Sequence, residues 1–109
     1  MSKIQDIRLM FIDAMLIVHG EVSRSVIANT FGVQVAAASL DMRAYRDLNP
    51  NGIYLDHTTK TWRKEDDFFP LPGLLKMPAA EFISHIEALF SVKIKQKRYR
   101  KSRLEAVEQ

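Results

Sequence analysis

Apolar residues recur at helical spacing near the start of the chain. The positions that form this stripe are Ile4, Ile7, Met10, Phe11, Met15 and Val18. Leu16 and Ile17 widen the stripe, so the pattern predicts a helix that is buried on more than one side. Gly20 marks the end of this helix, because glycine commonly follows a helix C-terminus.

Two further helices are predicted next, separated by a tight turn. Ser23 is placed to cap a helix that runs to Phe31, and Gly32 closes it. After a two-residue turn, a third helix is predicted over about Val35–Leu48. The breakers Asn49-Pro50-Asn51-Gly52 then stop it.

A short β-hairpin and a fourth helix follow. Strands at 53–55 and 61–63 flank a polar turn, with Asp56 at its entry. Pro78 suits the first position of the fourth helix. The apolar stripe of that helix consists of Phe82, Ile83, Ile86, Leu89 and Phe90.

This order of elements is that of a winged helix-turn-helix. The predicted fold is mostly α with a small β-hairpin, and it carries an additional C-terminal helix. We expect a winged helix-turn-helix DNA-binding domain over residues 1–76, a C-terminal helix that could serve dimerisation over 77–91, and a basic tail over 92–109.

The second and third predicted helices meet the packing requirements of a helix-turn-helix. Ala28 is small enough for the two helices to approach closely, and Gly32 can take the positive φ of the turn. The apolar residues spaced to pack between the helices are Ile27, Phe31, Val33, Ala38, Met42 and Tyr45. The Ala-x-x-x-Gly pattern is weak alone, but the apolar stripes and the following hairpin make it specific.

The outward face of the third helix is predicted to enter the major groove of DNA. It consists of Gln34, Ala36, Ala37, Ser39, Leu40, Arg43 and Arg46. Small residues let the backbone approach the bases, Ser39 can donate or accept, and Arg43 can read guanine. Leu40 and the alanines suit thymine methyl groups. Alternatively, Leu40 belongs to the core and Arg43 is a solvated or salt-bridged arginine. Asp41 is expected to fix a neighbouring arginine or a helix end.

Phosphate contacts are predicted on either side of that helix. One group lies at the start of the second helix, where free backbone amides attract anions: Ser23, Arg24 and Ser25. The other is the hairpin tip: His57, Thr58, Thr59 and Lys60. An ordinary exposed turn is the alternative interpretation of the tip.

The charge distribution also favours a polyanionic partner. The net charge is +3, but residues 93–109 hold seven of the 16 Lys and Arg and only two of the 13 Asp and Glu. A basic arm of this kind is typical of contacts with nucleic acid, with a solubilising tail as the alternative.

Several function classes are disfavoured. The chain has no cysteine, which excludes a disulfide framework and a thiolate nucleophile. Its three histidines stand far apart, and no glycine-rich phosphate loop or serine elbow is present, so we expect no enzyme, no metal site and no cofactor. No apolar run reaches the roughly 18 residues of a membrane helix, and no signal peptide is recognised, so the cytoplasm is the expected compartment.

The run from Gly32 to Tyr45, followed by Leu48-Asn49-Pro50 and a hairpin with Tyr54 and Trp62, resembles a known family. It is similar to the N-terminal winged helix-turn-helix of WYL-domain regulators, and within these to the BrxR/CapW group of repressors associated with phage-defence loci. The resemblance covers roughly residues 5–90.

The resemblance is strongest in the third helix. Its agreeing positions are Ala38, Ser39, Asp41 and Tyr45. The group typically has serine in place of Gln34 and proline-glutamine in place of Ala36-Ala37. Because the chain ends before a WYL domain, the ligand-sensing role of that domain is not carried over.

Residue pattern and resemblance together predict a sequence-specific DNA-binding transcriptional regulator. We expect a repressor that binds an inverted repeat in double-stranded DNA as a homodimer, with the first helix and the Pro78–Phe90 helix at the dimer interface. Alternatively, both helices complete one monomer core. The alternative function is a winged-helix protein-interaction module, an adaptor or inhibitor without specific DNA binding. A third is an RNA-binding protein led by the basic tail.

Overall fold

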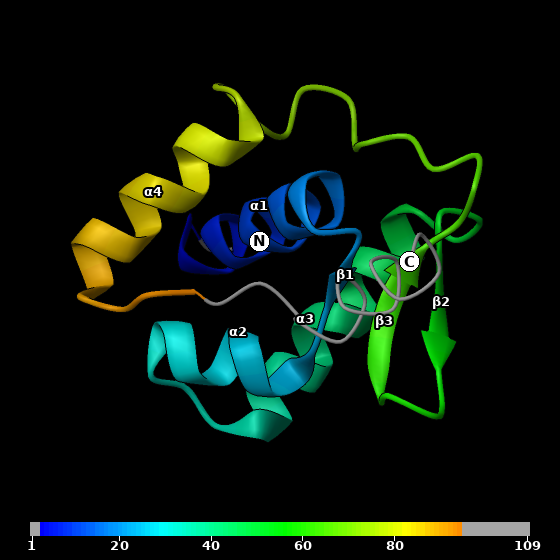
Figure 1. Ribbon diagram of the computed structural model, residues 1–109, viewed down its shortest axis with the longest axis horizontal. Coiled ribbons are helices and arrows are strands. Elements are labelled where there is room, and N and C mark those ends of the chain that lie inside the picture. Colours follow the sequence, from blue (N-terminus) through cyan, green and yellow to red (C-terminus); the bar gives the residue numbers. More distant parts are fainter. Residues whose placement is uncertain (1–2, 95–109) are drawn as a thin grey trace, which may run out of the picture.

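The computed structural model describes residues 3–94, which form four helices and three strands (Figure 1). In chain order these are α1 (Lys3–Val18), β1 (Glu21–Val22), α2 (Arg24–Phe31), α3 (Val35–Leu48), β2 (Ile53–Asp56), β3 (Thr61–Lys64) and α4 (Ala79–Phe90). This confirms the predicted fold class, a mostly α winged helix-turn-helix with a C-terminal helix. From residue 95 onward, the predicted basic tail lies outside the described residues. None of the four helices is long and apolar enough to cross a membrane.

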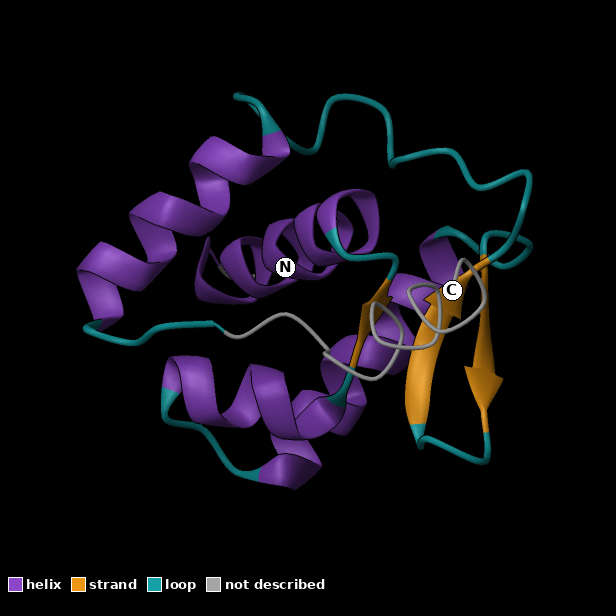
Figure 2. Ribbon diagram, in the orientation of Figure 1, coloured by secondary structure: helices purple, strands orange, loops and turns teal. Residues whose placement is uncertain are grey.

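The sheet contains one strand more than the predicted hairpin (Figure 2). β3 is the middle strand and pairs antiparallel with both neighbours, in the order β1-β3-β2. Val22 of β1 and Leu55 of β2 both pair with Trp62 of β3. β1 has only two residues, which is too short for an alternating pattern to be visible in the sequence. It forms because β3 would otherwise present an unpaired edge.

α1 lies between α4 and the α2–α3 pair and contributes most of the core (Figure 1). Its buried apolar residues are Leu9, Phe11, Ile12, Ala14, Met15 and Leu16. The prediction that this helix is buried on more than one side is therefore confirmed. The prediction was wrong at Ile7, Ile17 and Val18, which are 38%, 36% and 40% exposed. The neighbouring elements surround the middle of α1 and leave these positions nearer its ends uncovered.

α4 packs one face on α1 and leaves its last turn exposed. Phe82, Ile83 and Ile86 are buried, whereas Leu89 is 76% exposed. Pro78 stands just before this helix rather than within it, because its ψ of 143° is extended. Its carbonyl accepts the first helical hydrogen bond, from the Phe82 amide at 3.0 Å.

A buried carboxylate joins α1, α3 and the connector that leads to α4. Asp13 has no exposed surface, and its Oδ1 accepts hydrogen bonds from the Tyr45 hydroxyl at 2.5 Å and the Leu71 amide at 3.2 Å. Burial raises the pKa of Asp13, and these two hydrogen bonds oppose the shift without cancelling it. Burial and the Asp13 carboxylate also raise the pKa of Tyr45.

Asp13 should make the stability depend on pH. The pKa of Asp13 is higher in the folded chain than in the unfolded chain, where it is near the ordinary value of 3.8. In the pH range between these two pKa values, the folded chain keeps the proton and the unfolded chain loses it. Stability from this group is present below that range and is lost as pH rises through it, by up to about 1.4 kcal/mol per pH unit. In Asp13→Asn this loss should be absent. Urea unfolding at a series of pH values checks it, and a pH-independent difference between variant and wild type would contradict it.

Candidate nucleic-acid interface

The helix-turn-helix is closed by local backbone geometry at both ends of α2. Ser23 is its N-cap, with Oγ accepting the Val26 amide at 3.1 Å. Gly32 is its C-cap in the left-handed conformation, with φ of 67°, and its N–H donates to the Ala28 carbonyl. A Cβ at Gly32 would meet no atom within 4 Å, so the positive φ alone is what favours glycine there. This turn directs the chain from α2 into α3.

The predicted phase of α3 is confirmed. Ala38, Met42 and Tyr45 are buried in the core. Leu40 is 58% exposed, which excludes the alternative that it belongs to the core, and Arg43 is exposed as well. The outward face of α3 is therefore available to a partner.

Asp41 on α3 is buried in an ion pair. Its Oδ2 accepts from Arg8 Nε of α1 at 2.5 Å, and its Oδ1 accepts from Arg8 Nη2 at 3.3 Å. The side chain of Asp41 is 1% exposed and that of Arg8 is 15% exposed. The expectation that Asp41 fixes an arginine holds, although its partner comes from a distant helix. Asp41 therefore adds no negative charge to the outward face.

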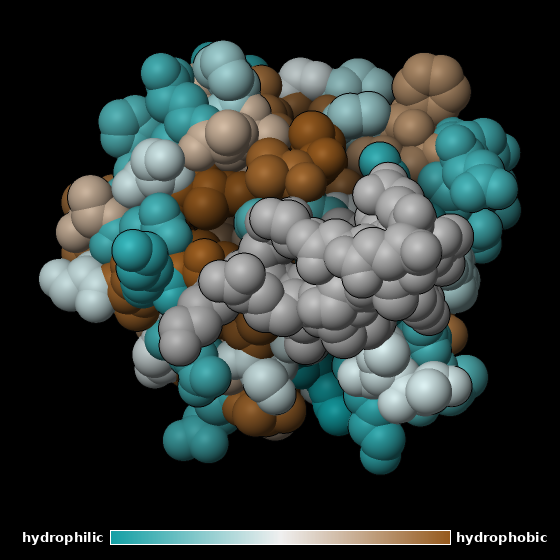
Figure 3. Space-filling view, in the orientation of Figure 1, coloured by the Kyte–Doolittle hydropathy of each residue, from teal (hydrophilic) through white to brown (hydrophobic). Residues whose placement is uncertain are grey.

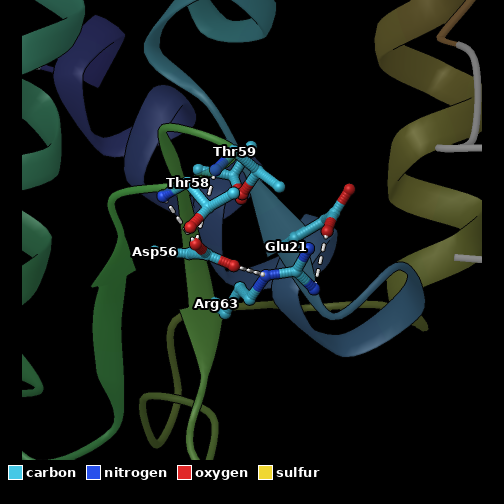
Figure 4. Close-up of polar contacts among 6 residues, drawn as sticks. Glu21, Asp56, Thr58, Thr59 and Arg63 are labelled. Carbon is cyan, nitrogen blue, oxygen red and sulfur yellow. Dashed lines mark hydrogen bonds and ion pairs between the residues drawn. The ribbon is translucent and has the colours of Figure 1, made fainter. Parts of the chain in front are cut away.

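The β2–β3 hairpin, here called the wing, is held in position by a polar network that begins at its turn (Figure 4). Asp56 Oδ1 accepts the Thr58 and Thr59 amides at 2.9 and 3.3 Å. Arg63 of β3 donates from Nε to Asp56 Oδ2 at 2.9 Å and places Nη1 3.0 Å from Glu21 Oε1 of β1. The wing tip is thus tied to the three-stranded sheet.

This network also keeps Asp56 ionised. Partial desolvation acts to raise the pKa of Asp56, but the Thr59 and Thr58 amides and the Arg63 guanidinium outweigh it, so the pKa is lowered. An ionised Asp56 holds the turn whose last residue, Lys60, has a left-handed φ of 58°. Lys60 is thereby presented at the end of the wing.

A cleft of about 370 Å³ lies between α3 and the wing. Its lining residues are Arg24, Ser39, Met42, Arg43, Arg46, Leu55, His57, Lys60 and Trp62. Four of these carry a positive charge and none is acidic. Arg24 Nη1 donates to Ser39 Oγ at 3.1 Å, and the Arg46 guanidinium lies 5.8 Å from the Trp62 ring centroid, in cation–π range. Such a concentration of one sign of charge attracts a polyanion.

The cleft gathers six of the residues predicted from the sequence to contact DNA. These are Arg24, Ser39, Arg43, Arg46, His57 and Lys60. Most of the other predicted residues do not line the cleft but are exposed or half-buried: Ser25, Gln34, Ala36, Ala37, Leu40, Thr58 and Thr59. Ser23 is buried and its Oγ serves the cap, which leaves Arg24 and Ser25 as the accessible phosphate candidates at this helix start.

Sequence reasoning missed the side chains that line the cleft from the sheet. Leu55 and Trp62 are cross-strand partners on adjacent strands, and both face the cleft. The sequence pattern placed them only in the strands of the hairpin and gave them no part in the site. A pairing register for the hairpin could have shown that they stand opposite each other. Within residues 3–94, no group of three or more His, Asp or Glu is placed to hold a metal ion.

Comparison with known proteins gives consistent matches. The model of the BrxR transcriptional regulator winged helix-turn-helix domain matches residues 5–88. The DNA-binding transcriptional repressor CapW of Escherichia coli strain KTE188 is 36% identical over 67 residues, which cover 62% of this chain and 22% of CapW. CapW of Pseudomonas aeruginosa is 34% identical over 64 residues, which cover 59% of this chain and 21% of that protein. The matched region spans about a fifth of the length of these curated relatives.

Proposed function

Because the chain belongs to the family of BrxR transcriptional regulator winged helix-turn-helix domains, we propose that it binds double-stranded DNA sequence-specifically and represses transcription. α3 would enter the major groove, and the wing would rest on the adjacent sugar-phosphate backbone. The repressor role is proposed from the similarity to CapW, which is named a repressor. A place among phage-defence regulators is part of the same proposal.

The observation that carries the proposal is the cleft between α3 and the wing. It is lined by Arg24, Arg43, Arg46 and Lys60 without an acidic residue. Of the two acidic residues on α3, Asp41 is buried against Arg8, and Asp47 is exposed near the end of the helix but does not line the cleft. Arginines of α2 and α3 and a lysine of the wing suit the phosphates and base edges of a duplex.

We further propose that the chain binds an inverted repeat as a homodimer. The exposed last turn of α4, with Leu89 and Phe90, supports this assembly, as do the exposed Ile7 and Val18 of α1. Apolar surface lies beside α1 and α4 on the face shown in Figure 3. Light scattering should give about twice the 12.5 kDa of one chain. A value of one chain mass at high concentration would favour the alternative that both helices only complete the monomer core.

Arg43→Ala should weaken binding to the preferred sequence by about 1–3 kcal/mol and relax the preference at one base pair. The reason is that Arg43 is exposed on the outward face of α3 and lines the cleft. Fluorescence anisotropy with a labelled operator measures the affinity. Lys76→Ala, which removes an exposed charge from the connector before α4, is the control and should act weakly and equally on all sequences. Wild-type affinity and preference in Arg43→Ala would contradict this role.

The decisive experiment selects bound sequences from a random duplex pool with the full 109-residue chain. We expect an inverted repeat whose half-sites are centred about one helical turn apart. Recovery of sequences without a shared motif, with affinity lost at moderate salt, would indicate non-specific charge attraction. That outcome would favour the protein-interaction module instead.

A further inference from the structure

The hydroxyl of Ser39 is already engaged before any DNA arrives. Arg24 is the first residue of α2, and Ser39 lies in the N-terminal half of α3. Arg24 Nη1 donates to Ser39 Oγ at 3.1 Å, and both side chains line the cleft. This contact joins the start of the first helix of the motif to the part of α3 that a winged helix-turn-helix directs at base edges.

The direction of this hydrogen bond limits what Ser39 can do next. A serine hydroxyl has one hydrogen to donate and two lone pairs that accept. Guanidinium can only donate, so it must take one of the lone pairs of Ser39 Oγ. A base amino group that approached the other lone pair would bring its positive hydrogens beside the guanidinium. A base acceptor, in contrast, meets the free hydroxyl hydrogen.

We propose that Arg24 is a positioning residue that makes Ser39 a hydrogen-bond donor to DNA and thereby selects the base opposite it. This inference rests on the DNA-binding function proposed above. In the major groove, guanine, adenine and thymine each present an acceptor, whereas the hydrogen-bonding edge of cytosine presents only its N4 amino donor. The structure therefore assigns to Ser39 the exclusion of cytosine at one position of the operator.

Arg24 keeps donors for a second partner while it holds Ser39. Guanidinium carries five N–H groups in a planar fork, and the bond to Ser39 uses one of them. Arg24 is exposed, at the helix start where phosphate contacts are predicted. A phosphate bound there would hold the guanidinium in place and so strengthen the direction imposed on Ser39. Backbone contact and base selection are coupled through one side chain.

The test is a set of parallel selections from a random duplex pool, with the full chain of each variant. Ser39→Ala identifies the position that Ser39 reads, because preference should relax there. Arg24→Met removes the donor with little change in side-chain length and should admit cytosine at that same position. Lys76→Met, a matched loss of one exposed positive charge on the connector, should leave the preference at every position unchanged. Thermal unfolding of each variant verifies that it is folded.

Affinities for paired duplexes give the magnitude. With wild type, cytosine at this position should weaken binding about tenfold. With Arg24→Met the penalty should fall to about twofold or less, and with Arg24→Lys, whose ammonium can donate to the same oxygen, it should be largely retained. In Ser39→Ala, adding Arg24→Met should cause no further change in base preference, because both substitutions remove the same contact.

Two results would overturn the inference, and they are distinguishable. If Arg24→Met weakens all duplexes equally and cytosine stays excluded, Arg24 contacts phosphate only. If wild type selects no shared motif at all, the proposed DNA-binding function fails, and the role of Arg24 fails with it. A relaxed preference at a position other than that of Ser39 would also contradict the proposal, because it would place Arg24 itself on a base.

Discussion

Replacing Arg8 with methionine should lower the free energy of unfolding by about 3–5 kcal/mol. Arg8 is the ion-pair partner of Asp41, whose side chain is 1% exposed. Methionine would preserve much of the packing of the arginine stem but would leave a carboxylate buried without its countercharge. Removal of one member of a buried pair costs more than the pair itself contributes, because the remaining charge stays desolvated. Urea unfolding followed by the fluorescence of Trp62, the single tryptophan, measures the loss.

The double variant Arg8→Met/Asp41→Asn separates this explanation from simple loss of packing. Its amide carries no charge, so the double variant should be more stable than Arg8→Met alone. The ion pair connects α1 to the inner face of α3, so the single variant should also bind DNA more weakly at temperatures where α3 loosens. Equal stability of the single and double variants would contradict an uncompensated charge as the cause.

The second large effect is expected at Phe11, where alanine should cost about 3–5 kcal/mol. Phe11 has no exposed surface and meets Phe31 of α2 edge-on, with ring centroids 5.2 Å apart. Phe31 in turn meets Phe90 of α4 at 4.9 Å. Alanine would open a cavity where three helices meet and would remove one edge-to-face contact. Because a small domain has only about 5–15 kcal/mol of stability, this variant should be close to unfolding at 37 °C.

Leu89→Ala is the matched control for this substitution. It also removes a large apolar side chain, but Leu89 is 76% exposed, so its effect on chain stability should stay within about 0.5 kcal/mol. If the homodimer forms through α4, the same variant should weaken dimerisation. Similar losses in the free energy of unfolding for Phe11→Ala and Leu89→Ala would contradict the argument that burial determines how much each truncation destabilises the chain.

The two networks that position the interface have different physical characters. The pair of Arg8 with Asp41 is buried and fixes α3 against α1. The network near the wing tip is buried at one end and open at the other: the side chains of Arg63 and Glu21 are 12% and 2% exposed, whereas that of Asp56 is 26% exposed. Exposed ion pairs contribute little stability, so changes at Asp56 should affect the placement of the wing tip more than the stability of the fold.

Local signals in the sequence were sufficient to predict α2, α3 and the turn between them. Ser23 caps α2 and Gly32 ends it in a left-handed conformation, as their chemistry predicts. The phase of α3 followed from the spacing of Ala38, Met42 and Tyr45, because a periodic apolar pattern reports which face is buried without knowledge of the partner. The outward face, with Ser39 and Arg43, was therefore also determined by the sequence.

Features that depend on residues far apart in the chain needed the tertiary structure. β1 pairs with β3 across most of the motif, and Arg8 reaches Asp41 from a helix 33 positions earlier. The apolar periodicity of α3 indicates that Asp41 points inward, but it does not identify the cation that compensates the charge of Asp41. The exposed ends of α1, at Ile7 and Val18, likewise follow from where the other elements cover it. Ser39 shows most clearly the difference between what the sequence predicts and what the tertiary structure adds. Its place on the outward face was visible in the sequence, whereas its hydrogen bond from Arg24 exists only because α2 and α3 pack together.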